Sequence, residues 1–390
     1  MSRLEAEHLY KVFGRRPEAA VRRLEGGAGR DELRADGTTA AVIDASFTVE
    51  PGQIFVVMGL SGSGKSTLLR MLNGLLEPTA GRVLFDGRDL TALSARELRS
   101  VRSRRISMVF QHFALFPHRS VLENAAYGLE VQGVEPAERK RRATEALALA
   151  GLAGWEDSWP DELSGGMQQR VGLARALATD ADLLLMDESF SALDPLIRRD
   201  MQDQLLELQK TLKKTIVFIT HDLNEAMRLG DRIAVMRDGR IVQQGSAEDI
   251  LVTPADDYVA SFTQDVDRTR VLTAGAIMAE PETAYGTRTD EGEELGSAEQ
   301  VMAAAPAVVK ADTPITELFT PCSTSGVAVA VTCEKGELIG VVPRARLLAV
   351  LGEPMAPAEE SEPGETTGST EPDGSDGAPE SSGAGAVAHA

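Results

Sequence analysis

The sequence predicts an α/β fold in which helices surround a buried, mostly parallel β-sheet. The main observation is a series of continuous apolar runs with helical stretches between several of them, namely GRVLFDG (81–87), ISMVF (106–110), DLLLMDE (182–188), TIVFIT (215–220) and RIAVM (232–236). Strands that are buried on both faces of a parallel sheet have this apolar character. A second observation is AVIDASFTVEPGQIFVVMG (41–59), which predicts two strands joined by a turn at Pro51–Gly52. We therefore expect one α/β domain from about residue 3 to about residue 262.

Two further segments of this domain have a clear local pattern. After residue 64, KSTLLRMLNGL places Leu68, Leu72 and Leu75 at helical spacing, which predicts a helix. The segment 14–38, GRRPEAAVRRLEGGAGRDELRADGT, interrupts the first two strands. Because it is charged and lacks a continuous apolar stripe, we expect a surface insert that can hold a short helix.

The composition changes beyond Asp265. Residues 308–352 predict a small α/β module with the order helix, strand, turn, strand, helix, and the turn falls at Lys335–Gly336. The stretch 281–300 before it is rich in Glu and Gly and predicts a linker. The tail 353–390 has nine acidic residues, no Lys or Arg and almost no large apolar residues, so it is expected to be disordered.

Charge and composition restrict the class of protein. The net charge of the 390-residue chain is −20, which argues against nucleic acid as its main partner. The only cysteines are Cys322 and Cys333, which indicates a reducing compartment. No apolar run reaches the roughly 18 residues that a transmembrane helix needs, and the N-terminus lacks the apolar core of a signal peptide. We therefore expect a cytosolic chain whose role at a membrane depends on a partner.

The stretch GLSGSGKST (59–67) fits the pattern G-x-x-x-x-G-K-[ST] in full, between an expected strand and an expected helix. Backbone N–H groups of such a loop surround phosphate oxygens, and the helix N-terminus favours negative charge. Lys65 is expected to bridge the β- and γ-phosphates of ATP, and the Ser66 hydroxyl to ligate Mg²⁺. The candidate nucleotide-binding residues of this loop are Gly59, Ser61, Gly62, Ser63, Gly64, Lys65, Ser66 and Thr67.

Polar residues that end other apolar strands supply the matching chemistry. Asp187 and Glu188 end one strand, where Asp187 is expected to support Mg²⁺ through water and Glu188 to polarise the attacking water. His221 ends the strand TIVFIT and is expected to contact the γ-phosphate. Gln111 follows another strand, and its amide oxygen can reach Mg²⁺ or the water.

The stretch LSGGMQQR (163–170) begins a second helix with an anion site at its N-terminus. A second anion site in the same subunit would be redundant for the binding of one ATP. If two chains pack head to tail, each helix start faces the phosphates held by the other chain, with twofold symmetry. We therefore expect a homodimer in which ATP lies between subunits. The candidate residues at this helix start are Ser164, Gly165, Gly166 and Gln168.

This set of motifs resembles the ABC transporter ATPase family over residues 3–262. The resemblance implies a P-loop NTPase fold with a mostly parallel sheet core, an antiparallel β subdomain and a helical subdomain at about 112–180. It also implies that His221 is the switch histidine and that SALD (191–194), which includes Asp194, contacts the partner of the dimer. Phe13 matches the aromatic residue that stacks on adenine, a position that tyrosine or tryptophan usually holds.

Further segments look like the ATPase subunit of glycine betaine/proline betaine importers, namely the insert at 14–38, the stretch 59–87, FQHFALFPHRSVLENAAYGLE (110–130) and SALDPLIRRDMQDQLLELQ (191–209). Residues 305–352 resemble one cystathionine-β-synthase (CBS) repeat, and importers of this class usually carry two. The segment 263–304 is therefore either a linker or a degenerate first repeat. The resemblance implies two integral membrane permease subunits, an external substrate-binding protein and a peripheral position on the cytoplasmic face of the cell membrane.

Two other interpretations remain open at this stage. The ATPase could serve an importer of another solute, such as an amino acid or a sugar, although no β-barrel pattern of the sugar importers follows residue 265. A soluble ABC protein of DNA repair or translation is a third interpretation, which a single ATPase unit, the acidic charge and the lack of a coiled coil disfavour.

Overall fold

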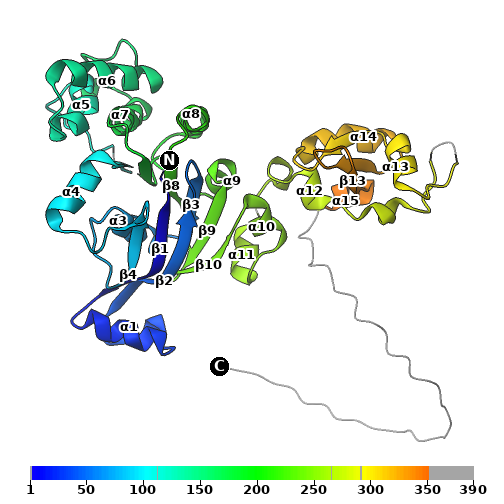
Figure 1. Cartoon of the computed structure of the whole chain (residues 1–390), viewed down its shortest axis with the longest axis horizontal. Coiled ribbons are helices and arrows are strands. Elements are labelled where there is room, and N and C mark those ends of the chain that lie inside the picture. The colour runs from blue at the N-terminus through cyan, green and yellow to red at the C-terminus, as the bar shows by residue number, and fades with distance from the viewer. Residues whose placement is uncertain (1, 112, 265, 290–291, 351–390) are drawn as a thin grey trace, which may run out of the picture. The chain divides into compact units, whose positions relative to one another are not determined.

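The computed structural model describes residues 2–350 except 112, 265, 290 and 291, so the predicted acidic tail lies outside the described residues. A six-stranded sheet with the order β10-β9-β3-β8-β7-β6 lies at the centre of the N-terminal domain (Figure 1). Its strands are β3 (Ile54–Met58), β6 (Ile106–Val109), β7 (Leu183–Asp187), β8 (Thr215–Thr220), β9 (Arg232–Arg237) and β10 (Arg240–Gly245). All neighbouring pairs in it are parallel except β9 and β10. The predicted α/β fold with a mostly parallel sheet is therefore confirmed.

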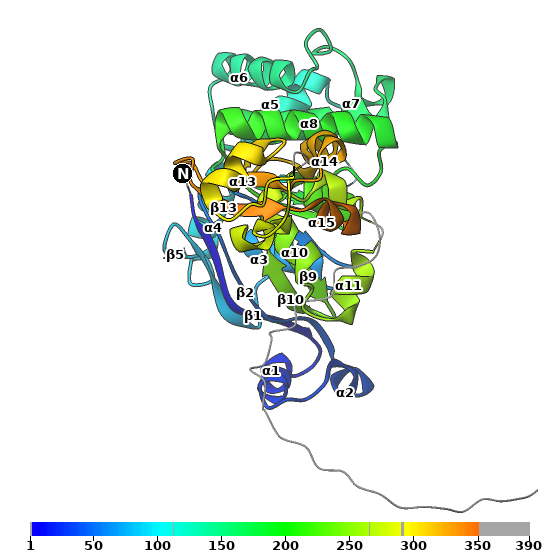
Figure 2. The same ribbon diagram turned by 90° about the vertical axis from the view of Figure 1, so that its right-hand side faces the viewer.

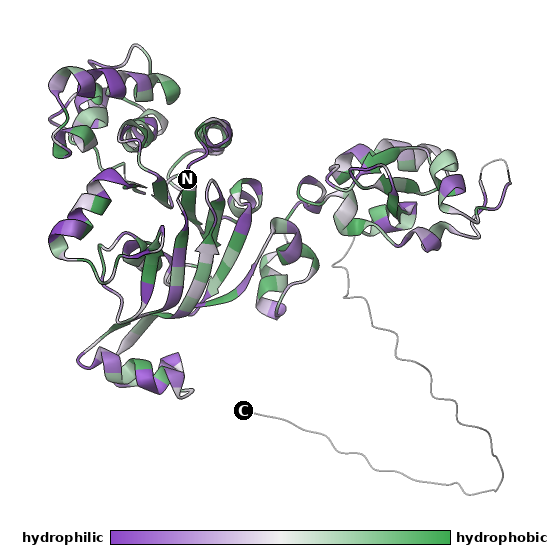
Figure 3. Ribbon diagram, in the orientation of Figure 1, coloured by the Kyte–Doolittle hydropathy of each residue, from purple (hydrophilic) through white to green (hydrophobic). Residues whose placement is uncertain are grey.

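Two hydrophobic cores cover the two faces of this sheet. Along β3, Ile54 and Val56 belong to one core, whereas Phe55 and Val57 belong to the other. Because side chains alternate between the faces of a strand, a strand covered on both sides needs apolar residues at every position. Figure 3 shows this apolar character along the central strands. The insert and a group of three helices are described below. The other helices of this domain are α3 (Lys65–Leu72), α4 (Ala95–Arg104), α8 (Pro195–Leu212), α9 (Leu223–Leu229), α10 (Ala247–Val252) and α11 (Asp257–Phe262).

A second, antiparallel sheet has the order β2-β1-β4-β5. Its strands are β1 (Leu4–Phe13), β2 (Thr39–Val49), β4 (Ala80–Phe85) and β5 (Arg88–Asp89). The two strands predicted within 41–59 exist, but β2 and β3 belong to different sheets. The Pro51–Gly52 turn therefore carries the chain from one sheet to the other.

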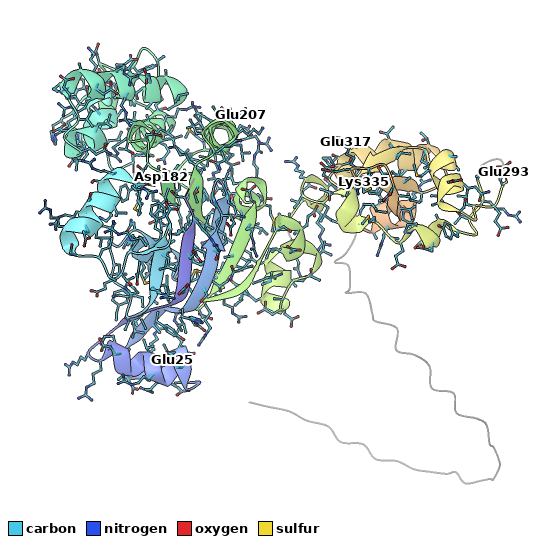
Figure 4. The ribbon with its side chains drawn as sticks, viewed as in Figure 1. Glu25, Asp182, Glu207, Glu293, Glu317 and Lys335 are labelled. Atoms are coloured by element: carbon cyan, nitrogen blue, oxygen red, sulfur yellow. The ribbon has the colours of Figure 1, made fainter. Side chains whose placement is uncertain are left out.

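The insert between β1 and β2 forms two helices, α1 (Pro17–Glu25) and α2 (Arg30–Ala35). Both pack on the end of the antiparallel sheet, in a small core formed by Tyr10, Val12, Ala20, Val21, Leu24, Leu33, Ala40 and Ile43. The sequence shows no continuous apolar stripe here because each helix is short and buries few side chains. Its charged residues, such as Glu25 (labelled in Figure 4), remain exposed. The insert is therefore folded onto the sheet through a core of its own.

Three helices between β6 and β7 form a group with its own core, and Figure 2 shows them lying together. They are α5 (Val121–Val131), α6 (Pro136–Leu149) and α7 (Gly165–Ala178). Serine side chains define where two of them begin. Ser120 forms a capping box with Glu123 at the start of α5, and the Ser164 hydroxyl accepts a hydrogen bond from the Met167 N–H at the start of α7. The local sequence thus fixes the position at which α7 exposes its N-terminal N–H groups.

The C-terminal segment contains a three-stranded sheet with the order β11-β12-β13. Its elements are α12 (Ala274–Ile277), α13 (Ala298–Ala304), β11 (Val308–Lys310), α14 (Phe319–Thr324), β12 (Val329–Thr332), β13 (Leu338–Val342) and α15 (Arg344–Ala349). Strand β11 was not predicted because it has only three residues and little burial. The segment 263–304 was predicted to be either a linker or a degenerate first repeat. In it, Ala279 pairs with Val341 of β13, and Val301 of α13 is buried.

We expect the insert to contribute measurably to stability. Leu24→Ala removes a buried side chain from the core between α1 and the sheet, and truncation of this kind costs about 2–5 kcal/mol. Urea unfolding, followed together with hydrogen exchange of residues 17–35, measures the effect. The matched control is Arg22→Ala, because Arg22 lies on the exposed face of the same helix. Equal stability of the two variants would show that this core does not form.

Candidate functional site

The loop that follows β3 is pressed against neighbouring backbone. Gly59 and Gly64 have φ angles of 151° and 105°, in the region that favours glycine. A Cβ atom at Gly59 would lie 2.2 Å from the Met236 carbonyl oxygen, and one at Gly64 would lie 2.2 Å from the Ala41 carbonyl oxygen. Only glycine fits at these two positions, so the loop is held close to β9 and β2.

Lys65, the first residue of α3, carries a buried positive charge with an exposed fraction of 4%. Its Nζ donates hydrogen bonds to the carbonyl oxygens of Gly59 (2.8 Å) and Leu60 (3.1 Å), and lies 3.7 Å from Glu188 Oε1. Burial lowers the pKa of Lys65, while the carboxylates of Glu188 and Asp187 oppose this shift. The ammonium group is thus fixed beside the loop, where an anionic ligand would complete its partners.

Ser66 and Asp187 meet beside Lys65. The Ser66 hydroxyl donates to Asp187 Oδ1 at 2.9 Å, and burial raises the pKa of Asp187. A hydroxyl and a carboxylate are oxygen donors of the kind that Mg²⁺ binds together with phosphate oxygens. These two side chains therefore fit the chemistry of a magnesium–nucleotide site.

The ends of β7 and β8 bring Glu188 and His221 together. These neighbouring parallel strands end at the same edge of the sheet, and the Glu188 N–H donates to the Ile219 carbonyl oxygen at 3.0 Å. His221 Nδ1 lies 3.1 Å from Glu188 Oε2. Glu188 has a φ angle of 44°, which is uncommon for a non-glycine residue and typical of residues that a site positions.

Gln111 follows β6, the strand next to β7, and approaches the same edge. Its Nε2 lies 3.5 Å from the Ser191 hydroxyl, which donates to the Glu188 carbonyl oxygen at 2.8 Å. One intermediate residue therefore connects Gln111 to the backbone of Glu188. The structure brings five of the predicted residues to one edge of the sheet, namely Lys65, Ser66, Asp187, Glu188 and His221, and places Gln111 beside them.

The second predicted anion site, at the start of α7, makes different contacts within the chain. The Gln168 side chain donates to the carbonyl oxygens of Pro160 (3.0 Å) and Leu163 (3.2 Å). A Cβ atom at Gly166 would lie 2.5 Å from Cγ2 of Ile197 on α8. The helix start is thus held by its own neighbours, and the absence of a side chain at Gly166 permits the close approach of α7 to α8.

The remaining two candidates are Phe13, at the end of β1, and Asp194, directly before α8. The Phe13 ring is 44% exposed, and Lys11 Nζ lies 5.3 Å from its centroid. The Asp194 side chain accepts hydrogen bonds from the N–H groups of Leu196 and Ile197, so it caps α8. The exposed Phe13 ring at the strand end is available for stacking, whereas the Asp194 side chain already stabilises the start of α8.

Sequence reasoning missed residues that brace the phosphate loop from outside. The Gly239 N–H donates to the Ser63 carbonyl oxygen at 3.0 Å. Arg30, in the insert, pairs with Asp238 at 2.9 Å and approaches the Gly62 carbonyl oxygen at 3.4 Å. The RDGR turn between β9 and β10 was visible in the sequence, but no local pattern connects it or Arg30 to a loop so distant along the chain.

These observations define a nucleoside-triphosphate site of the P-loop class. The loop has the full phosphate-binding pattern, Lys65 is a buried cation held beside it, and Glu188 and His221 lie together at the same sheet edge. Within the described part of the chain, the Ser63 hydroxyl is buried without a hydrogen-bond partner, as expected for a loop shaped around a ligand.

Comparison with known proteins agrees with this class. The family model for the ABC transporter matches residues 42–191. The glycine betaine transport ATP-binding protein OpuAA of Bacillus subtilis (strain 168) is 48% identical over 388 residues, covering 90% of this chain and 92% of that protein. The glycine betaine/proline betaine transport system ATP-binding protein ProV of Escherichia coli (strain K12) is 44% identical, covering 90% and 97%. The chain therefore belongs to the ABC transporter family and is an ATPase coupled to transport.

The fold also matches a solved structure. The dimeric structure of MJ0796, a bacterial ABC transporter cassette, has a TM-score of 0.54 and 31% sequence identity, and the match covers 63% of this chain and 98% of that one. Among the described residues, none of the helices is both long enough and apolar enough to cross a bilayer.

Removal of the buried cation should weaken nucleotide binding. Lys65→Ala deletes an ammonium group whose hydrogen bonds to phosphate are charge-assisted, which corresponds to a loss of ATP affinity of about 10-fold to 100-fold. Titration with a fluorescent ATP analogue measures the affinity. Lys210→Ala on α8 is the control, because Lys210 is exposed and pairs only with its helix neighbour Glu207. An unchanged affinity of Lys65→Ala would contradict the assigned phosphate loop.

Proposed function

We propose that this chain is the ATP-hydrolysing subunit of an ABC importer for glycine betaine/proline betaine-type osmoprotectants. The observation that carries the proposal is the hydrolytic set at one sheet edge, in a chain whose glycine betaine relatives match 90% of its length. The match thus extends beyond the ATPase domain common to the whole family and includes the C-terminal segment, whereas the ATPase motifs alone do not identify a cargo.

The residues of the site have separate roles in hydrolysis. Bound ATP supplies the γ-phosphoryl group that is transferred to water. Glu188 orients and polarises that water, and His221 holds the Glu188 carboxylate and contacts the γ-phosphate. Lys65 stabilises the charge that develops on the phosphoryl oxygens. Ser66, Asp187 and Gln111 would hold Mg²⁺, with Asp187 acting through water.

The second half of the site would come from another copy of the chain. In a head-to-tail homodimer, the start of α7 with Ser164, Gly165 and Gly166 faces the phosphates that the partner's loop holds. Phe13 stacks on adenine, and Asp194 lies in the loop that contacts the other subunit. Two observations support this arrangement: the α7 start lacks bulky side chains, and the similar bacterial cassette was solved as a dimer.

The ATPase would act on a membrane complex. Two integral membrane permease subunits would dock on the dimer from the membrane side, and an external substrate-binding protein would deliver the quaternary amine. This places the chain at the cytoplasmic face of the cell membrane as a peripheral subunit. We assign ATP hydrolysis to residues 3–262, with the insert at 14–38 and the helical subdomain at about 112–180. Residues 305–352 would form a CBS-like module, preceded at 263–304 by a linker or a degenerate first repeat.

Glu188→Gln should separate binding from hydrolysis. The amide keeps the size of the side chain but cannot act as a base, so the hydrolysis rate falls by about 10²–10⁴-fold while ATP affinity remains. The proposed dimer should then accumulate with ATP. Size-exclusion chromatography with light scattering measures the fraction of dimer. The control is Glu207→Gln, because Glu207 is an exposed residue of α8 (Figure 4). A Glu188→Gln variant that hydrolyses ATP at the normal rate would refute the assigned base.

The cargo can be tested in a reconstituted complex. With the permease and its binding protein in liposomes, glycine betaine should stimulate ATP hydrolysis several-fold, whereas methionine or maltose should leave it at the basal rate. A complex that methionine or maltose stimulates and glycine betaine does not would establish the alternative, an importer of another solute.

A further inference from the structure

Two loops carry the groups that must meet for hydrolysis. The base loop, residues 188–194, contains Glu188 and ends at Asp194 in the segment proposed to contact the other subunit. The histidine loop, residues 220–222, contains His221. The contact between Glu188 and His221 is 3.1 Å long, but the His221 side chain is 54% exposed. Because packing around this ring is limited, other groups must fix the distance between the two loops.

Arg198, near the start of α8, binds the base loop through its backbone. Its Nε donates to the Phe190 carbonyl oxygen at 3.3 Å, and one terminal nitrogen donates to the carbonyl oxygens of Ser191 (3.3 Å) and Leu193 (3.1 Å). The planar guanidinium group has several donors in a fixed geometry, which suits it to hold three carbonyl groups at once. Arg198 therefore determines the course of the base loop directly after Glu188.

The other terminal nitrogen of Arg198 reaches the histidine loop. It donates to Asp222 Oδ2 at 3.2 Å, while Oδ1 of the same carboxylate accepts the N–H groups of Asn224 (2.9 Å) and Glu225 (3.3 Å) at the start of α9. Figure 1 shows α8 and α9 next to each other. One side chain thus connects the residue after His221 to the residues after Glu188.

A buried carboxylate completes the network. Glu225 is 3% exposed and accepts hydrogen bonds from the Thr220 hydroxyl (2.6 Å) and from Gln202 Nε2 (3.2 Å), and Arg198 Nε lies 3.8 Å away. Burial raises the pKa of Glu225, and Arg198 is a nearby positive charge that opposes this shift. The Thr220 hydroxyl also accepts the Asp222 N–H at 2.9 Å. Both sequence neighbours of His221 are therefore held by this network.

We propose that Arg198 is a positioning residue that fixes His221 relative to Glu188 by clamping the histidine loop to the base loop. The inference rests on the proposed dimer. When a second subunit contacts the base loop near Asp194, the displacement of that loop is transmitted through Arg198 to Asp222, and so to His221.

A merely structural arginine would give a different result. Loss of a structural contact lowers thermal stability and the fraction of active protein, but it does not change the dependence of the remaining activity on ATP concentration. A loosened clamp lowers kcat while the ATP affinity is kept, because the phosphate loop and Lys65 make no use of Arg198. It also removes the coupling between two sites, which appears as a Hill coefficient for ATP falling toward 1.

The full-length protein with Arg198→Met and Arg198→Lys tests this inference. We expect Arg198→Met to lower kcat at least about 10-fold, since a displacement of about 1 Å in an active site can cost about 10²-fold. The KM for ATP should change less than about twofold, and the Hill coefficient should fall toward 1. Arg198→Lys keeps a charge near Asp222 and Glu225 but cannot hold three carbonyl groups, so it should fold normally and still lose cooperativity.

Arg199→Met is the matched control, since Arg199 is the adjacent, exposed residue of the same helix. If Arg198→Met does not fold, as measured by circular dichroism, Arg198→Lys decides the question. Equal kcat and Hill coefficients for the Arg198→Lys and Arg199→Met variants, with normal ATP-dependent dimerisation in the Glu188→Gln background, would overturn the clamp alone. A failure of Glu188→Gln to dimerise would overturn the proposed dimer, on which the clamp depends.

Discussion

The parallel pairing of β3, β8, β7 and β6 is the constraint on which the site depends. In this arrangement the carboxyl ends of all four strands lie along one edge. The phosphate loop, His221, Asp187 with Glu188, and Gln111 each follow one of these strands directly. No long loop is needed to bring the groups together. Their spacing is therefore determined by the distance of about 4.8 Å between neighbouring strands.

A buried positive charge gives this edge its electrostatic character. Lys65 loses solvation because α3 begins beneath the loop, and the carbonyl oxygens of Gly59 and Leu60 provide only partial replacement. Glu188 lies 3.7 Å away, so the cation and the proposed base are neighbours. The proposed roles in binding phosphate and in activating water are therefore carried by one pair of opposite charges.

The sequence predicted the parts of the molecule whose signal is local, and it missed those that depend on distant contacts. Strand β3, the loop at 59–67 and the acids after β7 were predictable because apolar runs, glycines and acids adjoin along the chain. The core of the insert was missed, since Leu24 and Leu33 become a core only against β1 and β2. Arg198 and Arg30 were missed for a related reason: each joins a carboxylate and backbone carbonyl groups from separate segments of the chain, and no local sequence pattern records such contacts.

The contacts that the sequence did not predict also bear on the proposed two-subunit site. Within the chain, the Gly239 N–H holds the phosphate loop from outside, and Arg198 holds the base loop. Among the described residues, no hydrogen bond joins the start of α7 to the phosphate loop of the same chain: Gln168 donates to the carbonyl oxygens of Pro160 and Leu163, and Gly166 lies close to Ile197. In the proposed dimer, the start of α7 from the other subunit would supply a second set of N–H donors to the phosphates, so that assembly would complete the site.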